Sequence, residues 1–132
     1  DYPTTAKPNG LVHDAYGSGQ YRTFRKIGDF TRPGPASTWV FIDEHPDSIN
    51  DGLFGVNMPA RALWSAANGY ATWDDVPASY HNGAGGLSFA DGHSEIHRWV
   101  DPGTLKPGVG GDRKAPRDVP WIQARGSVPV NH

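Results

Sequence analysis

The sequence contains no cysteine, little charge and no long apolar run. Without cysteine the chain cannot form a disulfide framework, a zinc finger, an iron–sulfur site or a catalytic thiol. Charged residues make up 20% of the chain and its formal net charge is −2, so it offers no basic surface for nucleic acid or an anionic membrane. No apolar run approaches the roughly 20 residues of a membrane span. Nucleic-acid-binding and membrane-embedded classes are therefore excluded for these residues.

Glycine and proline are abundant instead, with 17 and 12 residues, more than a fifth of the chain. Because each of them destabilises a helix interior, a helix bundle is disfavoured. Five tryptophans, five tyrosines and five phenylalanines nevertheless supply a hydrophobic core. We therefore expect one α+β domain, mainly antiparallel β, with long Gly/Pro-rich loops over residues 1–132.

The distribution of glycine and proline residues along the chain predicts three regions within that domain. Residues 1–20 indicate an irregular N-terminal arm, 21–100 the folded core, and 101–132 an extended Pro/Gly-rich tail. Weaker patterns favour strands at 21–26 and 53–58 and a short helix at 59–67. The start at Asp1, with neither an initiator methionine nor a signal peptide, is typical of a processed or truncated product.

Two segments give the strongest strand signals. Residues 37–43 contain the apolar run Trp39, Val40, Phe41 and Ile42, which predicts a central strand buried on both faces. Residues 87–100 predict a β-hairpin beside it, turning at Asp91-Gly92 through a two-residue turn of the primed type with positive φ.

The loop after the first of these strands is dense in hard oxygen donors. Five lie within nine residues: Asp43, Glu44, Asp47, Asn50 and Asp51. Such donors suit Ca²⁺, although Ile49 and Met58 stand where the EF-hand pattern needs ligands. The alternative is that these side chains cap turns through local hydrogen bonds to the backbone.

Candidates for catalysis are weaker. His93, Glu95 and His97 alternate along one strand and share a face, which resembles the ligand set of non-haem iron sites. Neighbours on one strand face lie about 6.5–7 Å apart, however, so a solvent-facing polar face is the simpler explanation. No serine lies in a nucleophile elbow and the glycine-rich stretch 83–86 lacks the phosphate-loop ending. Enzymatic activity is therefore left uncertain and not favoured.

Aromatic residues in loop context suggest a further alternative. Rings among Asn, Gly and Asp residues can stack on sugar faces, and four are candidates for a glycan site: Trp64, Tyr70, Trp73 and Tyr80. A small domain also needs its tryptophans for the core. A carbohydrate-binding or metal-dependent polysaccharide-active protein is thus the alternative function.

One long pattern carries a family resemblance. His81 is followed by nine residues and then Asp91-Gly92, and the acidic segment 39–52 lies upstream. Together these blocks resemble the pilin-like proteins named for that spacing, the prepilin-type, type II secretion-like pseudopilins of the Planctomycetes and Verrucomicrobia type. The similarity runs over about residues 21–100.

The resemblance implies a pilin-like small β-sheet domain behind a methylated, hydrophobic N-terminal helix that anchors in the membrane. That helix is absent here, so any membrane contact is expected only through a segment that these residues lack. The implied function is a non-enzymatic structural subunit, the exported globular domain of a type II secretion or type IV pilus-like filament, with copies of itself or other pilin-like subunits as partners. The implied location is periplasmic or extracellular, at the cell surface. Similar pseudopilins bind calcium in a β-domain loop, which adds calcium to the expectations for the acidic loop, with Asp91 as a further donor.

Overall fold

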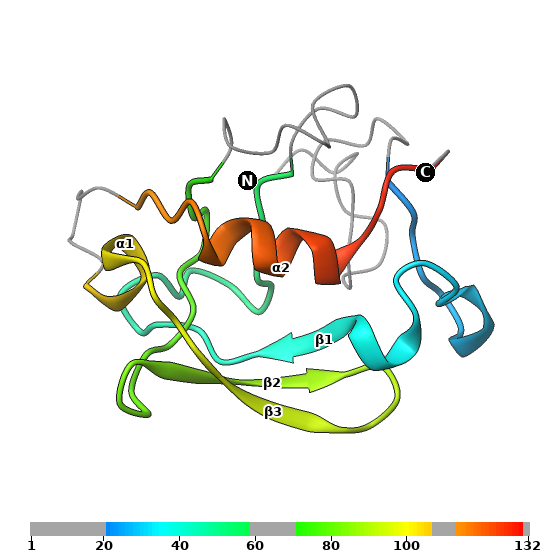
Figure 1. The fold of residues 1–132 in the computed structure, drawn as a ribbon, viewed down its shortest axis with the longest axis horizontal. Helices are drawn as coiled ribbons and strands as arrows, with labels where there is room; N and C mark the ends of the chain where they lie inside the picture. The colour runs from blue at the N-terminus through cyan, green and yellow to red at the C-terminus, as the bar shows by residue number, and fades with distance from the viewer. Residues whose placement is uncertain (1–20, 59–70, 107–112, 131–132) are drawn as a thin grey trace.

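A computed structural model describes residues 21–58, 71–106 and 113–130. Its centre is a three-stranded antiparallel sheet in the order β1-β2-β3, with one longer helix across one face of the sheet (Figure 1). The elements are the 3-10 helices η2 (Ile27–Asp29) and η3 (Pro35–Ser37), the strands β1 (Trp39–Ile42), β2 (Ala84–Phe89) and β3 (Ser94–Arg98), and the helices α1 (Pro102–Leu105) and α2 (Asp118–Gly126). The expected small α+β domain with an antiparallel sheet is confirmed.

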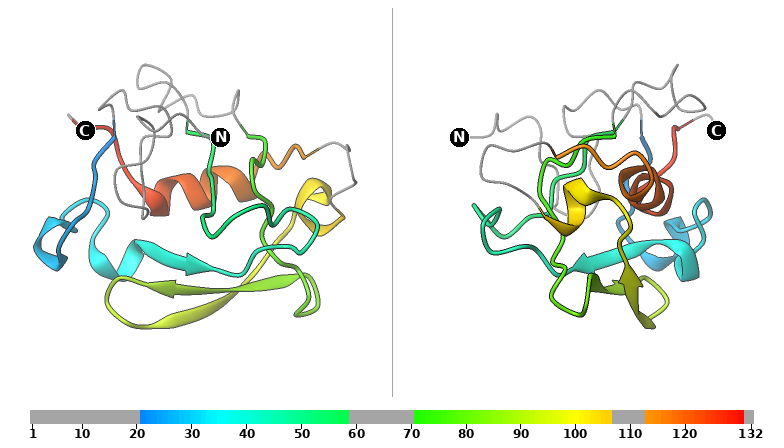
Figure 2. Two further views of the ribbon diagram at one scale, coloured as in Figure 1. Left: turned by 180° about the vertical axis from the view of Figure 1, so that it is seen from behind. Right: turned by 60° about the vertical axis from the view of Figure 1, so that its left-hand side comes forward.

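The prediction that residues 37–43 form a central, doubly buried strand is wrong. β1 pairs only with β2 in the described residues and is an edge strand, whereas β2 occupies the centre. Trp39 is buried but Phe41 is 71% exposed, because α2 covers one face of the sheet and leaves the other open (Figure 2). A register irregularity between these two residues lets the chain bulge at Val40.

Each end of β2 is closed by a turn, and the two turns differ. His81 and Ala84 exchange backbone hydrogen bonds of 3.1 and 3.2 Å across Asn82-Gly83, whose φ angles of 53° and 81° define a primed turn. This is the turn chemistry that the sequence analysis assigned to Asp91-Gly92.

At the other end of β2, the predicted two-residue turn is wrong. The Phe89 N–H donates to the His93 carbonyl across a three-residue loop in which Gly92 has a φ of 94°. Within the described residues Asn82 is the one non-glycine residue with positive φ, so Asp91 does not adopt it. Its carboxylate instead accepts the His93 N–H at 3.1 Å, and its own N–H donates to Pro35. These bonds fix the longer loop.

The expectation of an extended tail after residue 100 is also wrong, because this segment contains α1 and α2. Pro120 lies in the first turn of α2, where backbone N–H groups have no helical partner, so its missing N–H costs the helix nothing. The buried residues Val119 and Ile122 pack on the sheet, and the Trp39 indole N–H donates to the Ile122 carbonyl at 3.0 Å. The proline and glycine content of the tail therefore did not reveal its helix.

The core lies between the sheet and α2. It is built from nine buried residues: Trp39, Trp73, Val76, Leu87, Phe89, Trp99, Ala115, Val119 and Ile122. The Trp73 and Trp99 rings meet edge to face at 5.9 Å between centroids, a favourable geometry for aromatic pairs. The Trp99 indole N–H also donates to the Ala78 carbonyl at 2.9 Å across Gly85, where a Cβ atom would collide with that carbonyl.

Other sequence expectations have mixed outcomes. Residues 53–58 form no strand, although Phe54 and Val56 pack against the core. Residues 21–26 contribute only an isolated bridge between Tyr21 and Pro129. The predicted arm 1–20 and helix 59–67 lie outside the described residues. In the described ranges no helix has the length and apolar character needed to cross a membrane.

Candidate functional site

The acidic loop places its first two carboxylates differently. Asp43 follows β1 on the open face of the sheet, where a Cβ atom at Gly86 would lie 2.8 Å from the Asp43 Oδ2 atom. A larger residue at this position would require the Asp43 side chain to move. Glu44 is partly buried and accepts a hydrogen bond of 2.8 Å from the Ser48 hydroxyl. Adjacent residues on an extended segment point apart, so these two carboxylates do not converge.

The remaining loop donors are exposed. Asp51 accepts the Leu53 N–H at 2.8 Å, the local cap that the alternative interpretation of this loop expects. The Asp47 N–H donates to the His45 ring at 3.2 Å, and the Asp47 carboxylate lies 3.9 Å from the same ring. Asn50 is exposed beside them.

Two carboxylates that the sequence analysis missed join this region. Asp75 is buried and accepts the Gly55 N–H, and a Cβ atom at Gly55 would lie 2.7 Å from the Asp74 carboxylate. Burial raises the pKa of Asp75, and the neighbouring charges of Asp74 and Asp51 raise it further. The Asp-Asp pair directly before the apolar residues 76–78 was the available signal.

A pocket of about 260 Å³ lies between β1 and the acidic loop. Apolar side chains, among them Phe41, Ile49 and Phe54, line it together with Glu44 and Asp51. Burial raises the pKa of Glu44, and the charges of Asp75 and Asp51 add to the increase. This side of the domain therefore carries a pocket with apolar walls and two carboxylates in its lining.

Asp91 does not belong to that region. The loop after β1 lies near the start of β2, because these strands are antiparallel, whereas Asp91 follows the end of β2. Its carboxylate pairs with the His93 ring, whose other nitrogen lies 3.4 Å from Glu95. The hydrogen bond that the His93 ring makes to the Asp91 carboxylate raises the pKa of His93, and the ring also stacks on Phe89 at 4.4 Å between centroids.

The three alternating residues His93, Glu95 and His97, at and after the hairpin loop, do not form a metal centre. His93 is held by Asp91 at the tip of the hairpin, whereas His97 stacks on Trp121 at 3.7 Å between ring centroids. Burial lowers the pKa of His97, and the nearby Arg125 charge lowers it further. Across residues 21–58, 71–106 and 113–130, no three His, Cys, Asp or Glu side chains are grouped so that they could hold a metal ion. Calcium binding in the acidic loop stays a prediction.

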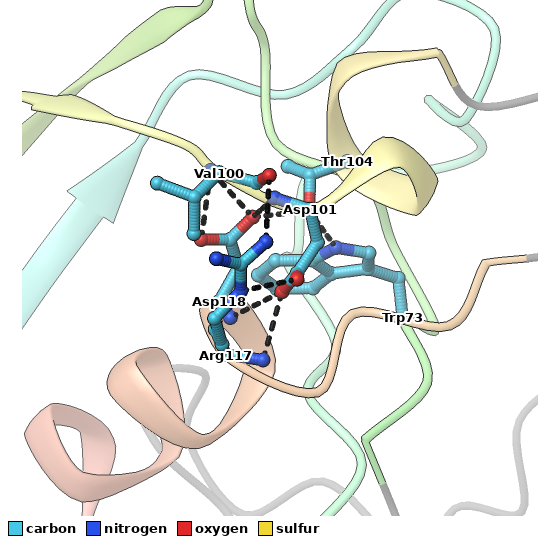
Figure 3. Close-up of polar contacts among 6 residues, drawn as sticks. All are labelled: Trp73, Val100, Asp101, Thr104, Arg117 and Asp118. Carbon is cyan, nitrogen blue, oxygen red and sulfur yellow. Dashed lines mark hydrogen bonds and ion pairs between the residues drawn. The ribbon is translucent and has the colours of Figure 1, made fainter.

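A dense polar network ties the segment after β3 to the start of α2 (Figure 3). Asp101 accepts the Asp118 N–H at 2.7 Å, and Asp118 in return accepts the Asp101 N–H at 2.9 Å. Thr104 donates to Asp118 at 2.7 Å and accepts the Trp73 indole N–H at 2.8 Å. We call Asp101, Thr104 and Asp118 the aspartate lock.

Each carboxylate of the aspartate lock is occupied by donors. Asp101 also accepts the Arg117 backbone N–H at 2.8 Å and its Nε–H at 3.0 Å. Burial alone would raise the pKa of Asp101, but these hydrogen bonds outweigh it and lower the pKa. The lock therefore holds the segment after β3 and the start of α2 together through both carboxylates. No local pattern predicts this pairing, because Asp101 and Asp118 lie 17 residues apart in the expected tail.

Two of the four candidate glycan-binding residues lie within the described residues. Trp73 is 3% exposed and packs in the core, so the expectation of a loop ring available for stacking on sugar is wrong for this residue. It is buried because it contacts the aspartate lock and Trp99. Tyr80 is 59% exposed and stacks on His45. Trp64 and Tyr70 lie outside the described residues.

A comparison with protein-family models finds no match for this chain, and comparisons with curated proteins and with solved structures find none either.

Proposed function

We propose that the chain is the exported globular domain of a pilin-like subunit, a structural component of a type II secretion or type IV pilus-like filament. The observation that carries the proposal is the role of the segment from His81 to Asp91. Its nine intervening residues are the primed-turn pair Asn82-Gly83, the whole of β2, and Ala90. The spacing of nine residues between His81 and Asp91 therefore equals the length of β2 together with the adjoining turn residues. Because β2 is the central strand, this spacing sets the length of the central strand of the sheet.

The hydrogen bonds at both ends of this unit support the same interpretation. The Trp99 N–H donates to Gly83 at 2.9 Å, which joins the primed turn to the end of β3. The Ala90 N–H donates to Thr38 at 2.9 Å, which joins the hairpin loop to the start of β1. A change in the number of intervening residues would break one of these connections. The spacing is therefore a constraint of folding rather than of catalysis.

A structural role is further supported by how the carboxylates are used. Asp101 and Asp118, the most densely hydrogen-bonded carboxylates described, accept backbone and side-chain donors and hold segments together. The open face of the sheet carries the exposed apolar residues Phe41 and Ile96, as a subunit that packs against neighbours requires.

The proposal is tested on the cells that make the protein. Antibodies raised against the domain are used for immunogold electron microscopy, and filaments sheared from the cells are analysed by mass spectrometry. Labelled filaments whose subunit contains these residues preceded by a processed hydrophobic helix are the expected result. Label confined to the cell interior, with no peptide of this chain in the sheared fraction, would contradict the proposal.

Calcium binding is a separable part of the proposal. Burial and the Asp75 charge raise the pKa of Glu44, so a cation bound beside these carboxylates would relieve their repulsion. We expect Ca²⁺ to raise the melting temperature, and Glu44→Gln to reduce that increase, because ligand binding to the folded state stabilises it. Asp91→Asn, at the other end of β2, is the matched control. Equal melting curves with Ca²⁺ and with chelator would remove calcium and leave the filament proposal standing.

A further inference from the structure

The outer edge of β3 is open for pairing. In the described residues β3 pairs with β2 alone. The His93 carbonyl and the Trp99 N–H both point to β2, so by the alternation of an antiparallel ladder Glu95 and His97 also bond to β2. The backbone groups of Ser94, Ile96 and Arg98 therefore point away from the sheet. Ile96, in the middle of this edge, is 69% exposed.

β3 lacks several of the usual protections of an edge strand, although it carries two charged side chains, Glu95 and Arg98. Its pairing with β2 is continuous from Ser94 to Arg98 without a bulge, and it contains no proline and no lysine. The open face beside it is flat, because Gly86 lies opposite Ile96 and Ser88 lies opposite Ser94. On this face an added strand would therefore meet no kink and no large side chain from β2, whereas on the other face Trp121 stacks on His97.

The residues of β3 are complementary to themselves in reverse order. In an antiparallel pair centred on Ile96, Ile96 faces its own copy, Ser94 faces Arg98, and Glu95 faces His97. The outward backbone groups of Ser94, Ile96 and Arg98 then oppose one another, as hydrogen-bonded pairs require. No like charges face each other, and the exposed isoleucines bury each other.

Other registers lack this agreement. A shift of two residues in one direction places Glu95 against Glu95, which is repulsive, and a shift in the other direction places Ile96 against Arg98. A shift of one residue sets outward backbone groups against inward ones. The centred register is therefore the favoured one.

We propose that β3 pairs with β3 of a second copy of this chain, antiparallel and centred on Ile96, so that two sheets become one continuous sheet across a two-fold axis. The pairing is closed and needs no filament, so it stands or falls independently of the proposed function. Five residues a side make a small interface, and the dimer is accordingly weak and concentration-dependent.

Sedimentation equilibrium of the purified chain over a series of concentrations up to millimolar tests the pairing. We expect a monomer–dimer equilibrium whose dissociation constant rises about tenfold or more in Ile96→Lys, because like charges then meet at the axis. Ile49→Lys is the matched control, since Ile49 is 58% exposed but lies away from β3, and its dimer should form as in the original chain. A monomer at every concentration, or a dimer unchanged by Ile96→Lys, would overturn the proposal.

A second variant tests the register. Because the chain has no cysteine, Ile96→Cys introduces a single thiol that the proposal places opposite its own copy, with Cα atoms about 5.5 Å apart and within disulfide range. Mild oxidation should convert this variant to a covalent dimer, whereas Ile49→Cys should stay mostly monomeric. Equal cross-linking of the two variants would argue against the centred pairing.

Discussion

The aspartate lock gives a quantitative test of what holds the domain together. Asp118→Ala removes the acceptor of the Asp101 N–H, of the Thr104 hydroxyl and of the Val100 N–H, which donates at 3.1 Å. Asp101 and Thr104 are buried, so two of these donors lose their acceptor where water does not replace it. A buried unsatisfied donor costs about 1–3 kcal/mol. The variant should therefore lose about 3–4 kcal/mol of unfolding free energy.

That loss is large for a chain of this size. Domains are stable by about 5–15 kcal/mol, so Asp118→Ala should lower the melting temperature by roughly 10 °C. Asp118→Asn keeps one acceptor oxygen and should lose about half as much free energy. Urea unfolding followed by tryptophan fluorescence measures the unfolding free energy of both variants, because Trp73 contacts the lock through Thr104.

The matched control for this experiment is Asp47→Ala. Asp47 is an exposed carboxylate in the acidic loop, so its removal in the presence of chelator should leave the unfolding midpoint close to that of the original chain. If Asp118→Ala is as stable as Asp47→Ala, the reciprocal hydrogen bonds do not stabilise the fold, and the reasoning is refuted.

Further predictions concern packing and pH. Gly85→Ala should destabilise by about 1–3 kcal/mol in chemical unfolding because its Cβ meets the Ala78 carbonyl, whereas Gly28→Ala, with open space around it, should not. The lowered pKa of Asp101 contributes stability above the unfolded value of 3.8 that is lost as the pH falls through the folded pKa, and acid unfolding should show this loss abolished in Asp101→Asn. The lowered pKa of His97 contributes stability that is lost below pH 6.5, and His97→Phe should flatten melting temperature against pH in that range. An unchanged pH profile in either variant would contradict its assignment.

The sequence predicted the sheet better than its surroundings. The β2–β3 hairpin was predictable because Asp-Gly and alternating residues are local signals. Its loop has three residues instead of the predicted two, and within it the Asp91 N–H donates to the Pro35 carbonyl, a tertiary contact that the local pattern does not contain. The edge position of β1 was not predictable, since a run of apolar residues does not say which face a distant helix will cover. The apolar run predicts that Phe41 is buried, but its side chain lies on the face that α2 does not cover and is therefore exposed.

The candidate site was harder to predict. The density of carboxylates after β1 was visible in the sequence, but the extended chain sends Asp43 and Glu44 apart, and Asp75 joins them only through folding. The lock between Asp101 and Asp118 was missed because the proline content of the segment argued against a helix there. The proline of α2 lies in the first turn, where a helix tolerates it, so the helix forms and brings Asp118 to Asp101. Local patterns indicate residue chemistry, whereas tertiary contacts decide which residues meet.

The helix α2 that covers the sheet also sets the order of events in biosynthesis. The Trp39 indole bonds to Ile122, which lies 83 residues later, and the Ser127 hydroxyl bonds to Arg22, which lies 105 residues earlier. During synthesis the aromatic inner face of the sheet therefore has no cover until α2 has emerged, and closing such long loops slows folding. A nascent chain stalled before residue 122 would expose the Trp39 and Trp99 side of the sheet, which makes it a natural client for chaperones that bind aromatic surfaces.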